Sequence, residues 1–175
     1  MKYLKLHLCG VMQYYSAQHT LVTAISGTYY KTEKTPTKSA VTGLIGAALG
    51  LPRKSEDLAK LYDSIIVKYE IVKKGSVLTD FQTVKPPKGE RFCTVEGKKR
   101  KEGDGIIKTI EYLQDAEFYV YIGGEEDLLM KISAALQNPV YEPFLGKKSC
   151  FPSYPILEDF TLYKQEDIKN VYDCP

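Results

Sequence analysis

The most chemically distinctive segment of the sequence spans residues 85–101, where basic side chains are dense and apolar ones are few. Lysine and arginine side chains on a flexible arm neutralise phosphates, and an aromatic residue such as Phe92 can stack on a splayed base. The alternative is a solvated surface loop, which is what most runs of charge are. The length of this segment favours a functional role over a plain loop, because structureless loops beyond about 12 to 15 residues are uncommon in compact domains. The basic residues of this arm are Lys85, Lys88, Arg91, Lys98, Lys99, Arg100 and Lys101.

The arm belongs to a charge gradient that runs along the whole chain. Residues 1–101 carry 18 basic and 8 acidic side chains, a net of +10, whereas residues 102–175 carry 6 and 14, a net of −8. The formal net charge of +2 hides this division. A basic front joined to an acidic back fits one surface for a polyanion and another surface for different contacts.

Cysteine and histidine offer less chemistry at the level of sequence. The four cysteines are too scattered to form a metal knuckle or a redox pair. His7 and His19 are the only imidazoles, which argues against a zinc site. We therefore expect no cofactor and no metal.

Composition and length place the chain among folded proteins. Hydrophobic residues at 43% and charged residues at 26% are ordinary globular values, and 175 residues suit a single domain over residues 1–175. The longest apolar run, residues 40–51, is interrupted by three glycines and is shorter than the ~20 residues of a membrane span. The first residues lack the apolar region of a signal peptide, so we expect a cytoplasmic protein with no membrane contact.

Alternating and helical patterns predict the elements that must position these residues. Period-2 and apolar runs predict strands over residues 2–9, 21–25, 65–72, 77–84, 106–113, 118–122 and 157–163. Apolar positions at helical spacing predict helices over residues 37–49 and 125–137, and Ser55 is a plausible N-cap for a short helix between them. The main elements follow the β-α-β-β-α-β order of an α+β, ferredoxin-like fold, which RNA-recognition (RRM-like) modules share.

Five segments, taken in order, resemble one protein family. They are residues 10–15, 35–50, 78–84, 111–116 and 144–150. Together they resemble the CasD-type subunit of the type I-E Cascade complex, which is the fifth CRISPR-associated family within the RAMP superfamily. The resemblance runs from residue 3 to about residue 156. Its most specific parts are the Pro-Thr-Lys-Ser sequence that begins the first helix and the Leu-Gly-Lys-Lys-Ser-Cys loop.

This resemblance implies an RNA-binding structural subunit that is not an enzyme. Such proteins cap the 5′ handle of the CRISPR RNA, and a protruding basic thumb hairpin, here the insertion at residues 85–105, folds over that RNA. The implied partners are the CRISPR RNA 5′ handle, a CasC-like backbone subunit and a CasA-like large subunit. Target DNA would be met only through the complex.

The resemblance also assigns residues outside the arm to RNA. Lys38 falls in the first turn of the predicted helix, where free N–H groups and the helix dipole favour a phosphate. The alternative for Lys38 is a solvated helix residue. The sequence Gly146-Lys147-Lys148 falls where RAMP proteins carry a glycine-rich loop, in which glycine permits close backbone approach and lysines supply charge.

Tyrosines and lysines that precede the first helix complete the expected RNA site. Tyr14 and Tyr15 lie where the family pattern reads Gln-x-Trp-Gly, so Tyr15 replaces the tryptophan and Ser16 the glycine. Lys31 and Lys34 are assigned to the same groove, which Tyr29 and Tyr30 would line with them. Packing in the core or on the surface explains the tyrosines equally well.

The alternative function is a metal-independent endoribonuclease that processes the CRISPR precursor, as a type I-C relative of the family does. Such cleavage needs a group that takes the 2′-OH proton, and histidine is the usual choice near neutral pH. A grouping of a tyrosine, His19 and Lys38 is the arrangement that fits. Against it, Gln82 stands where the family often has histidine. A third possibility is an RNA-recognition module outside any CRISPR system.

Overall fold

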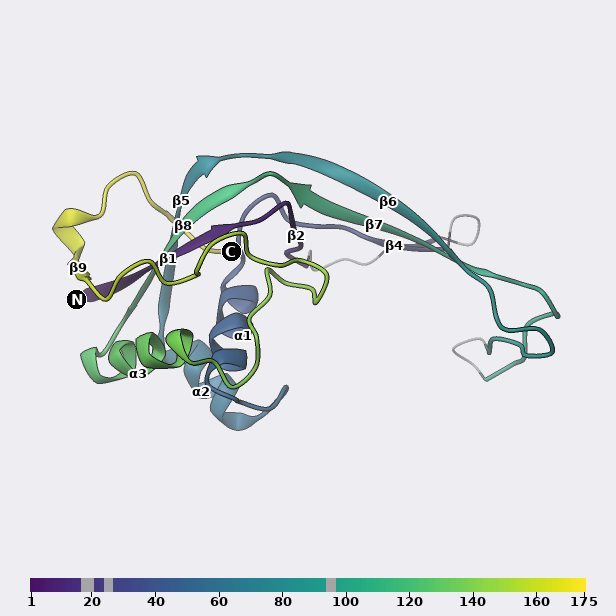
Figure 1. Cartoon of the computed structure of the whole chain (residues 1–175), viewed down its shortest axis with the longest axis horizontal. Coiled ribbons are helices and arrows are strands. Elements are labelled where there is room, and N and C mark those ends of the chain that lie inside the picture. The colour runs from purple at the N-terminus through teal and green to yellow at the C-terminus, as the bar shows by residue number, and fades with distance from the viewer. Residues whose placement is uncertain (17–20, 24–26, 94–96) are drawn as a thin grey trace.

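The computed structural model describes residues 1–16, 21–23, 27–93 and 97–175, and its main sheet is built around the first strand. Five strands lie in the order β10-β5-β8-β1-β9, and each neighbouring pair is antiparallel. Figure 1 shows the helices gathered on one side of this sheet. The strands are β1 (Lys2–Cys9), β5 (Ile66–Lys73), β8 (Glu117–Gly124), β9 (Leu162–Lys164) and β10 (Tyr172–Asp173), and a 3-10 turn, Gln165–Asp167, follows β9.

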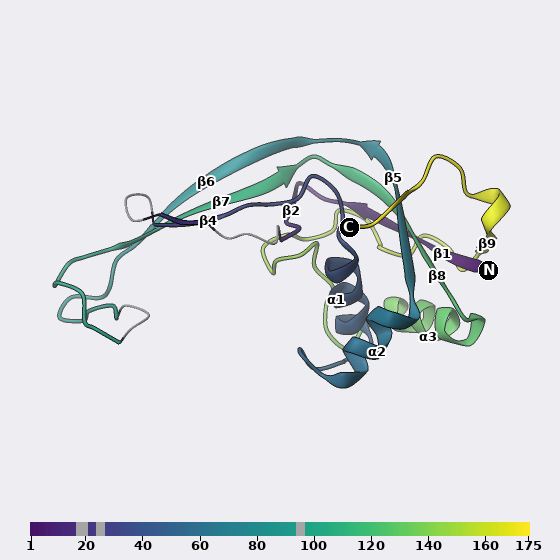
Figure 2. The same cartoon turned by 180° about the vertical axis from the view of Figure 1, so that it is seen from behind.

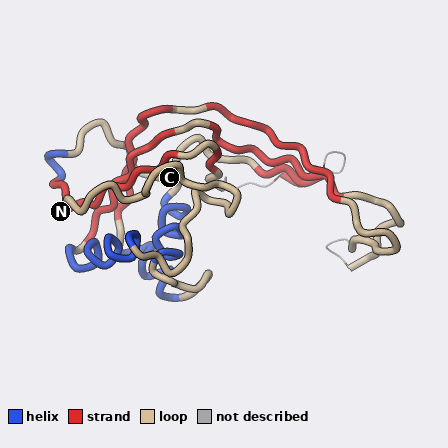
Figure 3. Tube along the Cα trace, in the orientation of Figure 1, coloured by secondary structure: helices blue, strands red, loops and turns tan. Residues whose placement is uncertain are grey.

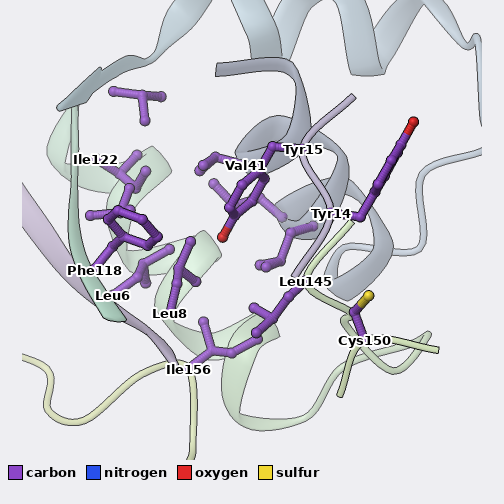
Figure 4. Packing of buried hydrophobic residues seen from close by; sticks show 14 of the residues in the cluster. Leu6, Leu8, Tyr14, Tyr15, Val41, Phe118, Ile122, Leu145, Cys150 and Ile156 are labelled. Atoms are coloured by element: carbon purple, nitrogen blue, oxygen red, sulfur yellow. The ribbon is translucent and has the colours of Figure 1, made fainter. Parts of the chain in front are cut away.

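Alternation along β1 and β8 decides which face of the sheet is buried. Leu6 lies opposite Val120 and Leu8 lies opposite Phe118, and all four side chains are shielded from solvent. They pack with Ile45 of the first helix in one core (Figure 4). The expected strand at residues 2–9 is therefore confirmed, and its buried face carries the leucines.

The helices begin where their capping residues predict. The helices are α1 (Lys38–Ala48), α2 (Glu56–Ser64) and α3 (Glu126–Gln137). Thr37 caps α1 by accepting a hydrogen bond from the backbone N–H of Ala40, and Ser55 caps α2 in the same way through Leu58. None of the helices in the described residues is both long enough and apolar enough to cross a membrane.

A second sheet is centred on β7. It consists of β2 (Met12–Gln13), β3 (Leu21–Thr23), β4 (Gly27–Tyr30), β6 (Ser76–Val84) and β7 (Ile106–Gln114). Strand β6 pairs with β7 along its whole length, whereas β4 runs parallel to the outer half of β7 and β2 pairs with its inner end. Strand β6 pairs with β7 alone among the named strands, so it forms an edge.

The two sheets share one continuous ribbon of chain. Strands β5 and β8 pair in the main sheet, and their extensions β6 and β7 pair in the second. The bend between β5 and β6 contains Gly75 at φ +67°, and a Cβ there would lie 2.4 Å from the Gln114 carbonyl oxygen. Asp115, at φ +53°, makes the matching bend between β7 and β8. Figures 2 and 3 show the ribbon arching far beyond the helices.

The expected C-terminal strand at residues 157–163 is largely wrong, because the strand observed there is only Leu162–Lys164. The preceding segment follows β1 without forming a regular ladder, and the His7 N–H donates to the Ile156 carbonyl at 2.7 Å. The two-residue strands β2 and β10 carry no recognisable alternation and were not expected. Of the predicted strand at 21–25, residues 24 and 25 lie outside the described residues.

Candidate nucleic-acid interface

The tip of the long hairpin carries its basic side chains into solvent. Beyond Val84 the chain leaves the sheet, and all seven basic residues expected to contact RNA are exposed. The described part of the tip is partly ordered, because Cys93 forms a β-bridge with Lys99 and the Arg100 N–H donates to the Phe92 carbonyl at 2.8 Å. Arg91 pairs with Glu102 at 3.4 Å, an exposed contact of small energetic value. The tip therefore presents a concentrated positive surface.

A second cationic feature lies at the root of the hairpin. The Lys147 ammonium is 3.8 Å from the ring centroid of Tyr14, 5.3 Å from that of Tyr30 and 5.4 Å from that of Tyr112. Burial lowers the pKa of Lys147, and the nearby Asp80 carboxylate acts against this. The rings compensate the ammonium for part of its lost hydration. We call Lys147 and these three tyrosines the root cluster.

Register explains why the tyrosines of the root cluster meet. Tyr30 on β4 lies opposite Ile110 on β7, and Tyr112 follows Ile110 by two residues, so both rings stand on one face of the second sheet. Asp80 is the β6 partner of Ile110 and lies on that face too. Tyr30 was expected to line the same groove as Lys31 and Lys34, whereas Tyr112 was not an expected site residue. Strand alternation identifies them once the pairing of β4 with β7 is known, but the sequence does not reveal that pairing.

Gly146 fixes Lys147 above these rings. Its φ is +96°, and a Cβ at this position would lie 1.6 Å from the Tyr14 carbonyl oxygen, so no side chain fits. The Tyr14 N–H donates to the Leu145 carbonyl at 2.9 Å, and the Leu145 N–H donates to the Cys150 carbonyl at 2.8 Å. The loop is thereby held against the chain that follows β1. The expected close approach at Gly146 is made to the protein's own backbone.

Replacing Lys147 should measure the stabilisation that the root cluster provides. We expect Lys147→Met, which keeps the apolar stem, to lower the free energy of unfolding by about 1–2 kcal/mol through loss of the partly desolvated cation–π contacts. Urea denaturation followed by circular dichroism measures the change. Lys148→Met is the matched control, because Lys148 is exposed, and it should cost less than about 0.5 kcal/mol. Equal effects of the two substitutions would contradict the cluster.

The burial of Tyr15 contradicts its expected place in the RNA site. Only 1% of its surface is exposed, and its hydroxyl donates to the side chain of Gln13, which in turn donates to the Ala116 carbonyl. Burial raises the pKa of Tyr15. Figure 4 shows the Tyr15 ring pointing into the centre of the core and the Tyr14 ring turned to another side, where it is also buried, at 7% exposure. Tyr15 therefore anchors the loop after β1 and is not available to stack on a base.

Lys38 begins α1 as expected, but its surroundings differ from a bare helix end. Its backbone N–H donates to the Pro175 carbonyl at 3.0 Å, so part of the N-terminus is already occupied by the chain itself. The Lys38 ammonium lies 4.3 Å from the ring centroid of Tyr62 on α2. Lys38 thus contacts α2, whereas Lys147 contacts the second sheet.

Lys31 and Lys34 are both exposed in the segment between β4 and α1. The Lys31 ammonium lies 6.0 Å from the ring centroid of Tyr29. The Tyr29 hydroxyl donates to a Glu111 carboxylate oxygen at 2.6 Å, and this bond raises the Tyr29 pKa. The second Glu111 oxygen accepts from the Thr32 N–H at 3.3 Å. Glu111 therefore ties the approach to α1 onto β7.

The catalytic grouping of the endoribonuclease alternative stays a prediction. His7 is largely buried on the outer face of the main sheet, between two carboxylates. Gln82 donates to Asp80 at 2.6 Å. His19, which the endoribonuclease alternative requires, lies outside the described residues.

Comparison with known proteins gives a consistent result. The family model described as CRISPR-associated protein (Cas5) matches residues 3–173. The CRISPR system Cascade subunit CasD of Escherichia coli (strain K12) is 30% identical over 163 residues, which cover 88% of this chain and 69% of the relative.

Solved structures agree with that similarity. A chain from a CRISPR RNA-guided surveillance complex superposes with a TM-score of 0.77 at 25% identity and covers 91% of this chain. The crystal structure of a Cas protein superposes with a TM-score of 0.61 at 25% identity and covers 95% of this chain. The chain spans 63% and 64% of the length of these two proteins, so each of them has substantial additional chain.

Proposed function

Because this chain belongs to the Cas5 family of CRISPR-associated proteins, we propose that it is an RNA-binding subunit of a Cascade-type surveillance complex. We propose further that it caps the 5′ handle of the CRISPR RNA. The observation that carries this function is the exposed basic tip of the β6–β7 hairpin. Dense exposed lysine and arginine side chains at the end of a long arm suit phosphate contact.

The fold can be interpreted in the same terms. We propose a single RAMP domain over residues 1–175, with a ferredoxin-like core and residues 85–105 as its thumb insertion. Four strands in the order β5-β8-β1-β9, with α1 between β1 and β5 and α3 between β8 and β9, support the ferredoxin-like assignment. The extended hairpin supports the thumb.

The proposed RNA surface has two parts. The tip supplies the seven basic side chains of residues 85–101, and the root supplies Lys147, which lies over the Tyr14 ring, and the exposed Lys148. Lys31, Lys34 and Lys38 remain predicted contacts beside the root, and Gly146 contributes through the loop geometry that it permits. Tyr14 and Tyr15 are left out as base-stacking residues because both are buried, at 7% and 1% exposure.

The exposed edge of the second sheet suggests a protein contact. Strand β6 carries apolar side chains that water reaches, including Phe81 at 64% exposure and Val77 at 43%. Uncovered strand edges with apolar side chains are suited to pairing with another chain. We propose that a CasC-like backbone subunit covers this edge and that a CasA-like large subunit is a further neighbour. Target DNA would be met through the assembled complex.

A noncatalytic role fits the surroundings of His7. Metal-independent RNA cleavage requires an imidazole or an equivalent base that reaches the 2′-OH. His7 is held between Glu117 and Glu158 and is only 8% exposed, so it does not reach a bound RNA backbone.

Incubation of the purified protein with labelled repeat RNA, with Mg²⁺ and separately with EDTA, tests this proposal. We expect the RNA to be retained in a gel-shift assay and to remain intact on a denaturing gel in both buffers. A scrambled RNA of equal length is the control for charge alone. Specific cleavage would establish the endoribonuclease instead, and equal binding of both RNAs would contradict recognition of the handle.

A further inference from the structure

The outer face of the main sheet, opposite the helices, carries a compact group of potential metal ligands. His7 and Cys9 are two residues apart on β1 and therefore stand on the same face, and Glu117 on β8 is the cross-strand partner of Cys9. One ligand atom from each of these residues lies within 4.8 Å of the other two. The three side chains are brought together by regular strand pairing, so their positions are set by the most rigid part of the fold.

His7 is oriented for this role by groups on both sides of its ring. Nε2 lies 2.9 Å from a Glu117 carboxylate oxygen, and Nδ1 lies 2.9 Å from a Glu158 carboxylate oxygen. The Nδ1 contact has the distance of an ion pair but not the alignment of a hydrogen bond, so this buried nitrogen is poorly satisfied. A neutral imidazole has a single N–H, so it donates to one of the two carboxylates and faces the other with a lone pair.

The loop over this face keeps the arrangement in place. The Ser153 N–H donates to the Cys9 carbonyl at 2.8 Å, and the His7 N–H donates to the Ile156 carbonyl, so the loop follows β1 closely. The Tyr154 ring stacks on the His7 ring at a centroid distance of 5.6 Å. Glu158 reaches His7 from the same loop.

The net charge around these three side chains favours a bound cation. Glu117 and Glu158 flank the His7 ring, and Asp115 is a third carboxylate that acts on Cys9. Lys73, the β5 partner of Glu117, and Lys5, which lies over the Tyr119 ring, are the positive charges near this face. Three carboxylates against two lysines leave a net negative charge even while Cys9 is a neutral thiol.

We propose that His7 Nε2, Cys9 Sγ and the Glu117 carboxylate bind one Zn²⁺ ion, with a water molecule as the fourth ligand. Imidazole and thiolate ligands favour Zn²⁺ over Mg²⁺ or Ca²⁺. On binding, the Cys9 thiol releases its proton to solvent, and the His7 Nδ1–H donates to Glu158, the arrangement by which carboxylates orient metal-bound histidines. Bond lengths of about 2.0–2.3 Å are reached by small side-chain rotations.

This site revises the expectation of no metal that the sequence suggested. Zinc motifs are recognised from cysteines and histidines that come in close pairs, and here the third ligand is separated from the others by more than a hundred residues. The pairing of β1 with β8 brings Glu117 next to Cys9, and the sequence alone does not reveal that pairing. The site is independent of the proposed RNA surface, because it lies on the main sheet and not on the hairpin.

Cobalt(II) titration of the full chain tests the proposal. We expect a thiolate-to-cobalt charge-transfer absorption that saturates at one equivalent and disappears when Zn²⁺ is added. Cys9→Ser should abolish this absorption, whereas Cys93→Ser, which removes an exposed thiol of the hairpin tip, should leave it unchanged. Glu158→Gln should weaken zinc affinity by about 10- to 100-fold at unchanged stoichiometry, as the loss of an orienting partner does.

Three results would overturn the site. The first is wild-type protein that shows no charge-transfer absorption at one equivalent, and this measurement does not depend on any variant folding. The second is absorption that persists in folded Cys9→Ser. The third is absorption that is lost in Cys93→Ser, which would transfer the metal to the hairpin tip.

Discussion

Gly146→Ala should lower the free energy of unfolding by about 3 kcal/mol, an unusually large cost for adding one methyl group. Two effects combine at this position. The residue adopts φ +96°, where an L side chain is strained, and the added Cβ would lie 1.6 Å from the Tyr14 carbonyl oxygen. Relief requires the loop to move, which breaks the hydrogen bond from the Tyr14 N–H to the Leu145 carbonyl and draws Lys147 away from its rings.

Gly89→Ala provides the matched control. Gly89 also has a positive φ, +86°, but a Cβ there would have no atom within 4 Å. Backbone strain alone should cost about 1 kcal/mol. Urea denaturation of both variants measures the difference, which reports the contact with Tyr14. If the two substitutions cost the same, the loop at Gly146 does not lie against the chain that follows β1.

Reversing the charge at the hairpin tip should have the largest effect on RNA binding. We expect Lys98→Glu, Lys99→Glu and Lys101→Glu together to weaken binding of repeat RNA strongly at low salt. Each phosphate contact on a single strand contributes about 0.7 to the slope of log affinity against log salt, so three lost contacts reduce this slope by about 2. Fluorescence anisotropy over a series of salt concentrations measures both quantities.

The control is an equal change of net charge elsewhere. Lys54, Lys60 and Lys131 are exposed and lie on or beside the helices, far along the chain from the tip. Their replacement by glutamate changes the total charge by the same amount. A salt slope that falls equally in both triple variants would mean that net charge, and not the hairpin tip, governs affinity.

Local patterns in the sequence were sufficient to predict most of the regular elements. The alternation in β1 and the Ser55 cap each depend on residues that are neighbours in the chain. The basic segment at residues 85–101 was recognisable in the sequence, because charge density is a local property. Its basic side chains are exposed, as they would be in an RNA-binding arm or in a solvated loop, so its role stays a prediction.

Contacts between distant segments could not be predicted. The sequence gives no signal that β4 would run parallel to β7, and this pairing brings Tyr30 to Lys147. Tyr14 and Tyr15 are identical in type and adjacent, yet one faces a lysine and the other fills the core. Extended backbone sends neighbouring side chains to opposite sides, so one residue of register decides which tyrosine packs beneath Lys147 and which fills the centre of the core.

The ribbon formed by β5–β6 and β7–β8 has a mechanical consequence. A ligand at the hairpin tip would contact the ends of β6 and β7. Through the bends at Gly75 and Asp115 these strands continue into β5 and β8, which are adjacent in the main sheet. The hairpin tip is therefore connected to the core by two continuous strands. A ligand that orders the tip should reduce the opening of these strands and so slow amide hydrogen exchange in β5 and β8, far from the point of contact.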